Sequence, residues 1–210
     1  MGGRGTAALP QADGDDRNRQ ERGARRRQQI LDAAVELFAS KGYRGTGLAA
    51  LADRVQMTPT GLLYYFGTKE RLLREVVAER DRADHVDVPD EWTLENLRYL
   101  GRHNVDTALL TRLYAVLGAE SLDADEPLHD YFVDRYEMAR AFTRDILRSD
   151  IEAGRVRGDV DVEQVALEVI STLIGMESQW LSDPVEVDMA TSIDAYFARL
   201  AAQLAPPSAG

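Results

Sequence analysis

The spacing of apolar residues along the chain follows the repeat of an α-helix. In "QQILDAAVELFASKG" one apolar face recurs every three or four residues, and Gly42 then supplies a stop. This face is formed by Ile30, Ala34, Leu37 and Phe38. Thr46, Thr58 and Thr68 each stand where they can cap a further helix, and the last of these runs to about residue 84. No segment shows the sustained alternation of a strand, so the pattern predicts an all-α protein.

The remainder of the chain predicts more helices, separated by short turn signals such as "DADEP", "RGDVD" and "SDP". They are expected at 91–104, 106–120, 127–154, 161–182 and 185–204. Short connections favour antiparallel neighbours in one bundle. The predicted organisation is a disordered tail (1–16), a three-helix unit with a basic arm (17–67), a connecting helix (68–84), a helical bundle (85–204) and a second tail (205–210).

Charge is divided unevenly along the chain. The net charge is −11 over 210 residues, but residues 1–82 hold 15 Lys and Arg against 11 Asp and Glu, whereas residues 83–210 hold 10 against 25. Only the first part is positive, and local field decides phosphate binding. A polyanionic partner is therefore expected at the N-terminal part alone.

Composition excludes several classes of site. Cysteine is absent, which removes disulfides, thiolate metal ligands and cysteine nucleophiles. No stretch reads as a signal peptide or a membrane span, so we expect a soluble, cytoplasmic protein with no membrane partner. The three histidines are scattered, and no nucleophile motif, phosphate loop or metal-ligand spacing occurs, so we expect neither an enzyme nor a cofactor.

The stretch "TPTGLLYYFGTKERLL" carries the functional signal. Two short helices joined by "VQMT" have the spacing of a helix-turn-helix unit, whose second helix enters the major groove of DNA end-on. Thr58, Pro59, Thr60 and Gly61 keep the tip of that helix slim, and Pro59 falls at its first position, where a missing N–H is harmless.

The later residues of this helix divide by face. Leu62 and Phe66 are expected to pack inward, whereas Tyr64 and Tyr65 are expected to direct hydroxyls at phosphate oxygens, with core packing as the alternative for both tyrosines. Lys69 adds positive charge at the start of the next helix.

From about Arg26 to Val77 the sequence resembles the TetR family of transcriptional regulators. The resemblance rests on "ILDAAVELFASKGYRGTGLAALA" followed by "MTPTGLLYYFGTKERLL". It implies phosphate contacts from Thr46 and Lys69, phosphate or sugar contacts from Tyr64 and Tyr65, and base contacts from the tip. The chain departs from the family pattern at Ala49, Gln56, Leu63 and Gly67.

A basic arm, "RNRQERGARRR", precedes the first helical face and includes Arg26. Such a run is either a solvated charged segment or a flexible contact to the minor groove or backbone of DNA. Its position beside a helix-turn-helix favours DNA contact.

The last two predicted helices have broad apolar surfaces. These surfaces either pack inside the chain or meet a second copy, and the resemblance implies a homodimer with a four-helix interface. The candidate interface residues are Val169, Leu173, Trp180, Met189, Ile193, Tyr196 and Phe197.

The central helices supply candidates for a small-molecule pocket. Pockets in bundles join apolar walls to a few polar groups, although core packing is the alternative for each residue. The candidates are Asn96, Tyr99, His103, Tyr114, Phe142, Thr172, Met176 and Gln179.

Taken with the resemblance, these features imply a ligand-responsive repressor that binds a palindromic DNA operator as a homodimer and is released by a small molecule of unknown identity. The alternative is a DNA-binding or architectural protein that takes no ligand. A copurified small molecule, or a fully packed bundle, distinguishes the two.

Overall fold

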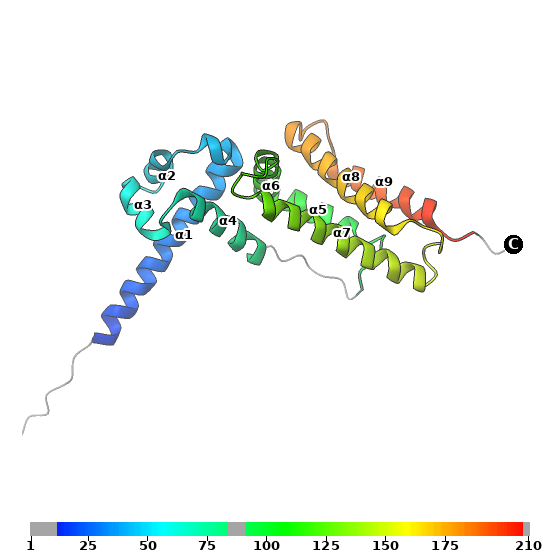
Figure 1. Cartoon of the computed structure of the whole chain (residues 1–210), viewed down its shortest axis with the longest axis horizontal. Coiled ribbons are helices and arrows are strands. Elements are labelled where there is room, and N and C mark those ends of the chain that lie inside the picture. Colours follow the sequence, from blue (N-terminus) through cyan, green and yellow to red (C-terminus); the bar gives the residue numbers. More distant parts are fainter. Residues whose placement is uncertain (1–11, 84–90, 208–210) are drawn as a thin grey trace, which may run out of the picture.

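The computed structural model describes residues 12–83 and 91–207, with side chains over 18–82 and 91–207. All regular structure in that part of the chain is helical, as the sequence predicts. Figure 1 shows an elongated molecule, with the N-terminal helices at one end and the C-terminal helices at the other. The helices are α1 (Ala12–Gly45), α2 (Leu48–Arg54), α3 (Pro59–Phe66), α4 (Lys69–Ala83), α5 (Arg98–Asp106), α6 (Ala108–Glu120), α7 (His129–Glu152), α8 (Val162–Ser182) and α9 (Met189–Leu204).

Local capping fixes the ends of α3 and α4. The hydroxyl of Thr58 accepts a hydrogen bond from the N–H of Gly61 at 3.0 Å, with Pro59 at the first helical position. Thr68 accepts in the same way from the N–H of Arg71 at 3.0 Å. Gly67, at φ 76°, ends α3. These predicted starts and stops are confirmed, because each depends on residues within one turn.

A hydrophobic core holds the N-terminal helices to α6 and to the start of α7. We call this the first core. It includes Ile30, Ala34 and Phe38 of α1, Leu51 of α2, Leu62 and Phe66 of α3, Leu72 and Leu73 of α4, Leu113 and Leu117 of α6, and Phe132 of α7. Helix α6 packs along α1, so the predicted domain boundary at residue 85 does not separate the packing of the chain into two parts.

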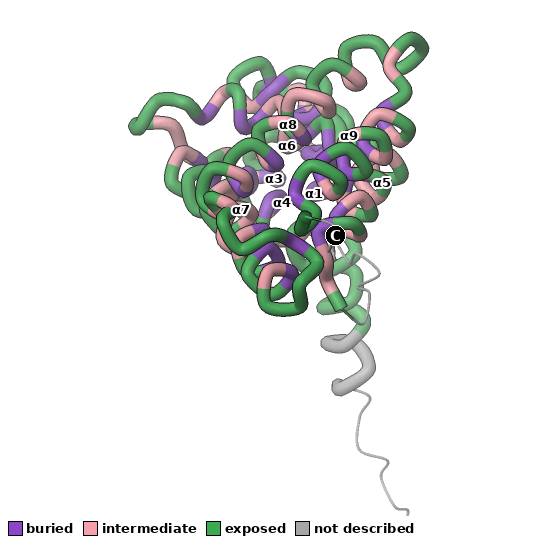
Figure 2. The backbone as a smooth tube through the Cα atoms, turned by 90° about the vertical axis from the view of Figure 1, so that its right-hand side faces the viewer, coloured by how far each residue is buried: buried purple, intermediate pink, exposed green. Residues whose placement is uncertain are grey.

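A second core fills the opposite end of the molecule. It includes Leu94 and Leu97, Ile146 and Leu147 of α7, Val169 and Leu173 of α8, and Ile193, Phe197 and Leu200 of α9. Helix α5 lies so close to α9 that a Cβ on Gly101 would overlap the side chain of Ile193. Figure 2, viewed along the long axis, shows the buried residues gathered inside and the exposed ones outside.

Two predicted helices begin later than expected. Helix α5 begins at Arg98 rather than 91, because residues 94–97 form turns and the N–H of Leu94 donates to the buried carboxylate of Asp150 at 2.8 Å. Helix α9 begins at Met189 rather than 185, where the carboxylate of Asp188 accepts from the N–H of Thr191. In the first place a side chain satisfies a backbone N–H that precedes the helix, and in the second a side chain caps the first turn of the helix itself.

The predicted tails differ in part from the structure. Residues 12–16, expected in the disordered tail, belong to α1. The rest of that tail (1–11), the segment 84–90 with His85, and residues 208–210 lie outside the described residues.

Burial corrects part of the expected dimer surface. Val169, Met189, Ile193 and Phe197 are each at most 1% exposed, since they form the second core, and they leave no surface for another copy. Leu173 is also buried, whereas Trp180 and Tyr196 are half-buried beside this core. The apolar period of a helix is the same for a core as for an interface, and here the core accounts for it. No described helix is long and apolar enough to cross a membrane.

Candidate functional sites

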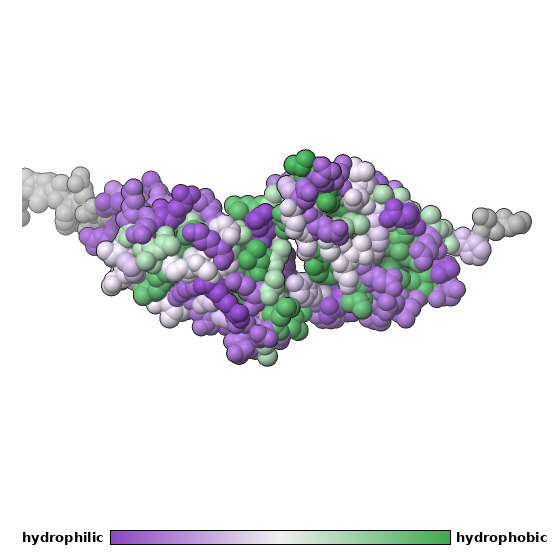
Figure 3. All heavy atoms as spheres, turned by 90° about the horizontal axis from the view of Figure 1, so that it is seen from above, coloured by the Kyte–Doolittle hydropathy of each residue, from purple (hydrophilic) through white to green (hydrophobic). Residues whose placement is uncertain are grey.

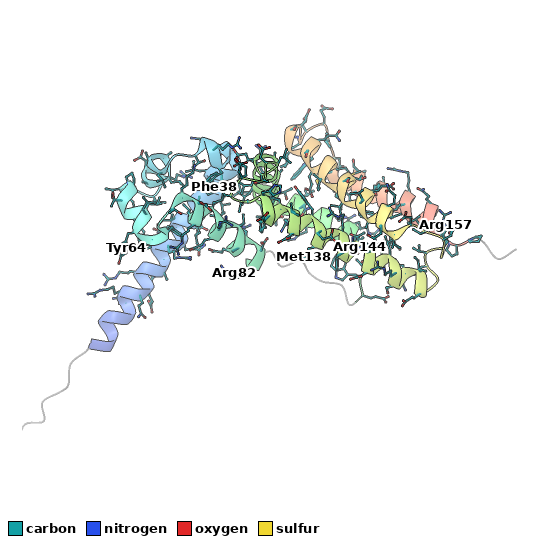
Figure 4. All side chains as sticks on the ribbon, in the orientation of Figure 1. Phe38, Tyr64, Arg82, Met138, Arg144 and Arg157 are labelled. Atoms are coloured by element: carbon teal, nitrogen blue, oxygen red, sulfur yellow. The ribbon has the colours of Figure 1, made fainter. Side chains whose placement is uncertain are left out.

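The first candidate site is the outer surface of α3. Thr58, Pro59 and Thr60 are exposed and Gly61 is half-buried, so the tip is slim and accessible. Tyr64 is 87% exposed and projects away from the molecule at its N-terminal end (Figure 4). These five residues present one polar surface, while Leu62 and Phe66 are buried on the opposite face as predicted.

The turn before α3 has an unusual backbone. Gln56 adopts φ 54°, a left-handed conformation that disfavours a side chain. Arg26 of α1 donates to the carbonyl oxygens of Val55 at 2.5 Å and Gln56 at 3.3 Å. The guanidinium of Arg26, expected to contact DNA, therefore holds the turn that positions α3.

Thr46 does not offer its side chain to DNA. The residue is fully buried, and its hydroxyl donates to the carbonyl oxygens of Gly42 at 2.7 Å and Leu37 at 3.2 Å. Gly47, not Thr46, occupies the capping position of α2, and no side chain caps it. The expected phosphate contact is corrected to a structural role: closing the bend between α1 and α2.

The remaining expected contacts are partly committed inside the protein. Tyr65 is half-buried against the first core, which favours its alternative of core packing. The ammonium of Lys69 donates to the carbonyl of Tyr43 at 2.5 Å and lies 4.1 Å from that ring's centre, and burial lowers the pKa of Lys69. Sequence reasoning missed Arg71, an exposed cation in the first turn of α4 to which no carboxylate of the described residues is paired.

The basic arm is the first part of α1, so it is helical rather than flexible from Ala12 onward. Two of its described side chains bond within the helix: Arg25 pairs with the side chain of Glu21, and Arg22 donates to the backbone carbonyl of Asn18. Figure 1 shows this part of α1 projecting beyond α2 and α3. The arm thus presents its charge in a fixed direction.

The second candidate site is a cavity of about 260 Å³ among α5, α6, α7 and α8. Apolar atoms supply most of its inner surface, and its apolar residues are Leu100, Leu110, Ala115, Phe132, Ala139, Ile170, Leu173 and Ile174. The polar lining comes from His103, Asn104, Thr107, Thr111, Tyr114, Arg135, Tyr136, Glu177 and Ser178. Leu110 and Phe132 belong to the first core and Leu173 to the second, so the cavity lies where the two cores meet. Figure 3 shows apolar residues around a notch near the middle of the molecule.

Of the residues predicted for a pocket, the structure brings His103 and Tyr114 to this cavity. The other six lie elsewhere. Asn96 bonds to the backbone of Thr93 and Glu91, and Gln179 bonds to the carbonyl of Gly175. Tyr99 lies on the surface beside Arg98, and Phe142 packs against Trp92. Thr172 lies beside Tyr196, and Met176 packs on the second core.

Sequence reasoning missed the charged residues of the cavity, Arg135 and Glu177. A signal was present, because each shares a helical face with apolar residues: Arg135 with Phe132 and Ala139, and Glu177 with Leu173. A charged residue on an apolar helical face is uncommon without a partner or a role.

A polar cluster joins the cavity to the last turn of α4. The carboxylate of Asp81 accepts hydrogen bonds from Tyr114 at 2.7 Å, Tyr131 at 2.9 Å and Arg135 at 3.0 Å. Arg135 also stacks on the ring of Tyr114, with its guanidinium carbon 3.9 Å from the ring centre. Burial raises the pKa of Tyr114 well above its usual value and that of Tyr131 to about 12, so both remain neutral donors near pH 7.

A second link joins α6 to the bend at the end of α1. The carboxylate of Glu120 accepts hydrogen bonds from the backbone N–H of Tyr43 at 2.6 Å and of Arg44 at 3.3 Å. Gly42 has φ 74° there, and a Cβ on it would overlap the Glu120 carboxylate. Arg44 also pairs with Glu126. We call the two backbone hydrogen bonds to Glu120, together with the close approach of Gly42, the Glu120 clamp.

No group of three or more His, Asp or Glu side chains that could hold a metal ion occurs among the described residues. What the two sites offer is recognition: a slim polar helix tip, and a mostly apolar cavity with one guanidinium and one carboxylate in its wall.

Two family models match the chain. The model described as "Bacterial regulatory proteins, tetR family" matches residues 30–76, and the one described as "Tetracyclin repressor-like, C-terminal domain" matches residues 113–193. The first begins within α1, covers all of α2 and α3 and ends within α4, and the second runs from α6 into α9.

Known proteins agree with these matches. The regulator AqdR of Rhodococcus erythropolis is 26% identical over 182 residues, which cover 83% of this chain and 82% of AqdR. The transcriptional repressor KstR2 of Mycobacterium tuberculosis is 27% identical over 151 residues, which cover 67% of this chain and 74% of KstR2. The crystal structure of the Bacillus subtilis regulator FadR in complex with stearoyl-CoA superposes with a TM-score of 0.67 at 17% identity. The superposition covers 84% of this chain and 98% of the FadR chain, and it shows that the two share a fold.

Proposed function

The chain belongs to the TetR family of bacterial transcriptional regulators, and on that premise we propose that it is a repressor that binds a palindromic operator as a homodimer and leaves it when a small molecule enters the cavity. KstR2, a relative that is named a repressor, supports repression over activation. The FadR complex supports ligand binding within this fold.

The exposed tip of α3 supports DNA recognition. Thr58, Pro59, Thr60 and Tyr64 are accessible, and the part of the chain that carries them is positively charged overall. Hydroxyls and methyl groups suit contacts to phosphates and thymine methyls, whereas this tip has no arginine or asparagine for bidentate base contacts. We therefore expect DNA shape to contribute much of the specificity.

The outer faces of α8 and α9 support a dimer. Small side chains occupy several of their exposed positions, which would let helices of a second copy approach closely there, and Leu167 and Ile174 add exposed apolar surface. These small residues are Ser171, Gly175 and Ser182 of α8, and Ala195, Ala198 and Ala202 of α9. Replacing Ala198 by Arg should shift the protein to monomer in sedimentation equilibrium. If the variant keeps the mass of a dimer, the interface does not include this face of α9.

The single observation that carries ligand control is the polar cluster at Asp81. Tyr114 and Arg135 line the cavity and also hold α4, the helix that follows the C-terminal end of α3. A ligand that displaces either side chain changes the hold on α4. Two conformations with different spacing of the two DNA-reading tips would then be populated differently, which is sufficient for control.

The Glu120 clamp gives α6 a second hold on the DNA-reading end. Helix α6 contributes Leu110, Thr111 and Tyr114 to the cavity and Glu120 to the clamp, so a shift of this one helix reaches both places.

Selection of bound DNA from a random pool by the purified full chain tests the DNA-binding part of this proposal. We expect a site with two related half-sites, because two copies present two tips. Enrichment of no sequence, or of a single half-site bound by monomer, would overturn it.

Release is tested by titrating the selected operator with and without a ligand of the cavity. By linkage, the ligand must weaken the operator by the same factor by which the operator weakens the ligand. A ligand that fills the cavity with no change in operator affinity would instead favour the alternative, a DNA-binding protein without ligand control.

A further inference from the structure

The polar side chains of the cavity wall differ in how many hydrogen-bond or ion-pair partners the protein itself gives them. The hydroxyl of Thr107 donates to the carbonyl of His103 at 2.8 Å, and that of Thr111 to the carbonyl of Asn104 at 2.7 Å. Arg135 is paired with Asp81 at 3.0 Å and stacked on Tyr114. These three side chains therefore have partners before any ligand enters.

Glu177 differs from them. Its carboxylate accepts one hydrogen bond, from the side-chain amide of Asn104 at 2.5 Å, and no cation of the described residues is paired with it. Burial raises the pKa of Glu177, in spite of the opposing effects of Asn104 and of the more distant Arg135. A carboxylate in a mostly apolar wall is poorly solvated, and an opposite charge at hydrogen-bond distance relieves that penalty.

The surroundings of Glu177 suit a cation attached to an apolar body. Tyr114, Phe132 and Tyr136 bring three aromatic rings to the cavity, and the faces of such rings attract ammonium groups. Leu110, Ile170, Leu173 and Ile174 supply apolar surface for the remainder of a ligand. The volume of about 260 Å³ is slightly below the roughly 300–1,000 Å³ of typical ligand pockets, which favours a compact molecule.

We propose that the cavity takes a compact, singly charged organic amine, whose ammonium group donates to Glu177 while its apolar body lies among α6, α7 and α8. This inference rests on the proposed function, because it names the chemical class of the effector. A carboxylate ligand is disfavoured, since Arg135, the guanidinium in the wall, is already held by Asp81.

Three probes of matched shape test the charge preference in the unaltered full chain without DNA: phenethylamine, phenethyl alcohol and phenylacetate. Titration calorimetry should give the tightest binding for phenethylamine, by about tenfold or more over the alcohol, as expected when a charge-assisted hydrogen bond is gained in a poorly solvated site. Equal or tighter binding of the alcohol or of phenylacetate overturns the proposal. So does binding of none of the three.

A pair of variants in α8 tests the residue. Glu177→Gln should weaken phenethylamine about tenfold and leave phenethyl alcohol nearly unchanged, whereas Glu168→Gln, on the exposed face of the same helix, should alter neither. Thermal melts show whether each variant is folded. Unchanged phenethylamine binding by folded Glu177→Gln overturns the assignment, and the three-probe comparison decides the matter without any variant.

These measurements separate the inference from the proposed function. If DNA selection finds an operator but the protein does not prefer the amine probe, the proposed repressor function is supported and the proposed amine ligand is wrong. If amine binding depends on Glu177 but does not release the operator, the amine site is supported and the proposed control of DNA binding by the ligand is wrong.

Discussion

The two hydrophobic cores differ in what they join. The first core unites α1–α4, which carry the proposed DNA-binding surface, with α6 and the start of α7, so these helices pack directly against elements of the cavity wall. The second core unites α5, α8 and α9 with the later part of α7 and has no element of the DNA-reading end. The cavity lies between them, lined by Phe132 of one core and Leu173 of the other. A ligand at this junction acts on the relation between two packed bodies rather than on the surface of one.

The largest expected effect comes from emptying each core in turn. Phe38→Ala and Phe197→Ala should each lower the free energy of unfolding by about 3–5 kcal/mol, because both rings are at most 1% exposed. Urea denaturation followed by circular dichroism should show one transition in both variants, since α7 contributes to both cores. Two transitions, with each variant lowering only one, would show that the cores unfold independently.

The same substitution at two close approaches separates the roles of the two regions. Gly42→Ala and Gly101→Ala should each lower stability by about 1–3 kcal/mol, because the new Cβ overlaps Glu120 in one case and Ile193 in the other. Only Gly42→Ala should also weaken the operator, since it disturbs the Glu120 clamp. Fluorescence anisotropy with operator DNA measures this, and equal losses of affinity would remove the clamp from DNA binding.

A smaller effect on stability is expected from two tyrosines that bond to Asp81 of α4, and their effects on ligand binding should differ. Tyr114→Phe and Tyr131→Phe each remove a hydrogen bond to Asp81 and should lower stability by about 0.5–1.5 kcal/mol. Tyr114 lines the cavity and Tyr131 does not, so only Tyr114→Phe should change the affinity for phenethylamine. If calorimetry gives equal changes in phenethylamine affinity for the two variants, the polar cluster at Asp81, rather than direct contact with Tyr114, determines ligand affinity.

At the DNA-reading surface the expected effect is on affinity alone. Tyr64→Phe should weaken the operator by about 0.5–1.5 kcal/mol and alter stability by less than about 0.5 kcal/mol, because the ring is 87% exposed. Tyr65→Phe, on the half-buried neighbour, is the matched control. Unchanged anisotropy titrations for Tyr64→Phe would remove its hydroxyl from the interface.

The smallest effect is expected in the turn before α3. Gln56→Gly relieves a left-handed backbone and should raise the free energy of unfolding by no more than about 1 kcal/mol. A loss of stability would show that the Gln56 side chain contributes more than the strain takes away.

Features that depend on a few neighbouring residues were predictable from the sequence. Thr58, Pro59 and Gly67 set the bounds of α3 through capping and a left-handed glycine, and the structure has them where the sequence places them. The inward positions of Leu62 and Phe66 followed from helical spacing alone.

Features that depend on distant packing were not predictable in the same way. A single helical period gives one apolar face but does not say what covers it, so Ile193 and Phe197 were expected at an interface and are buried in the second core. The cavity needs four helices at once, and its charged residues, Arg135 and Glu177, become meaningful only when Asp81 and Asn104 are seen beside them.

The Glu120 clamp grips main-chain N–H groups, and this determines which positions tolerate mutation. Any residue other than proline at positions 43 and 44 still supplies the donors, so the side chains there are free to diverge as far as this grip is concerned. The burden falls on Gly42 and Glu120, which are separated by 78 positions in sequence but meet in space. In a saturation mutagenesis scored by repression, these two positions should be the least permissive of the group and the most epistatic with each other.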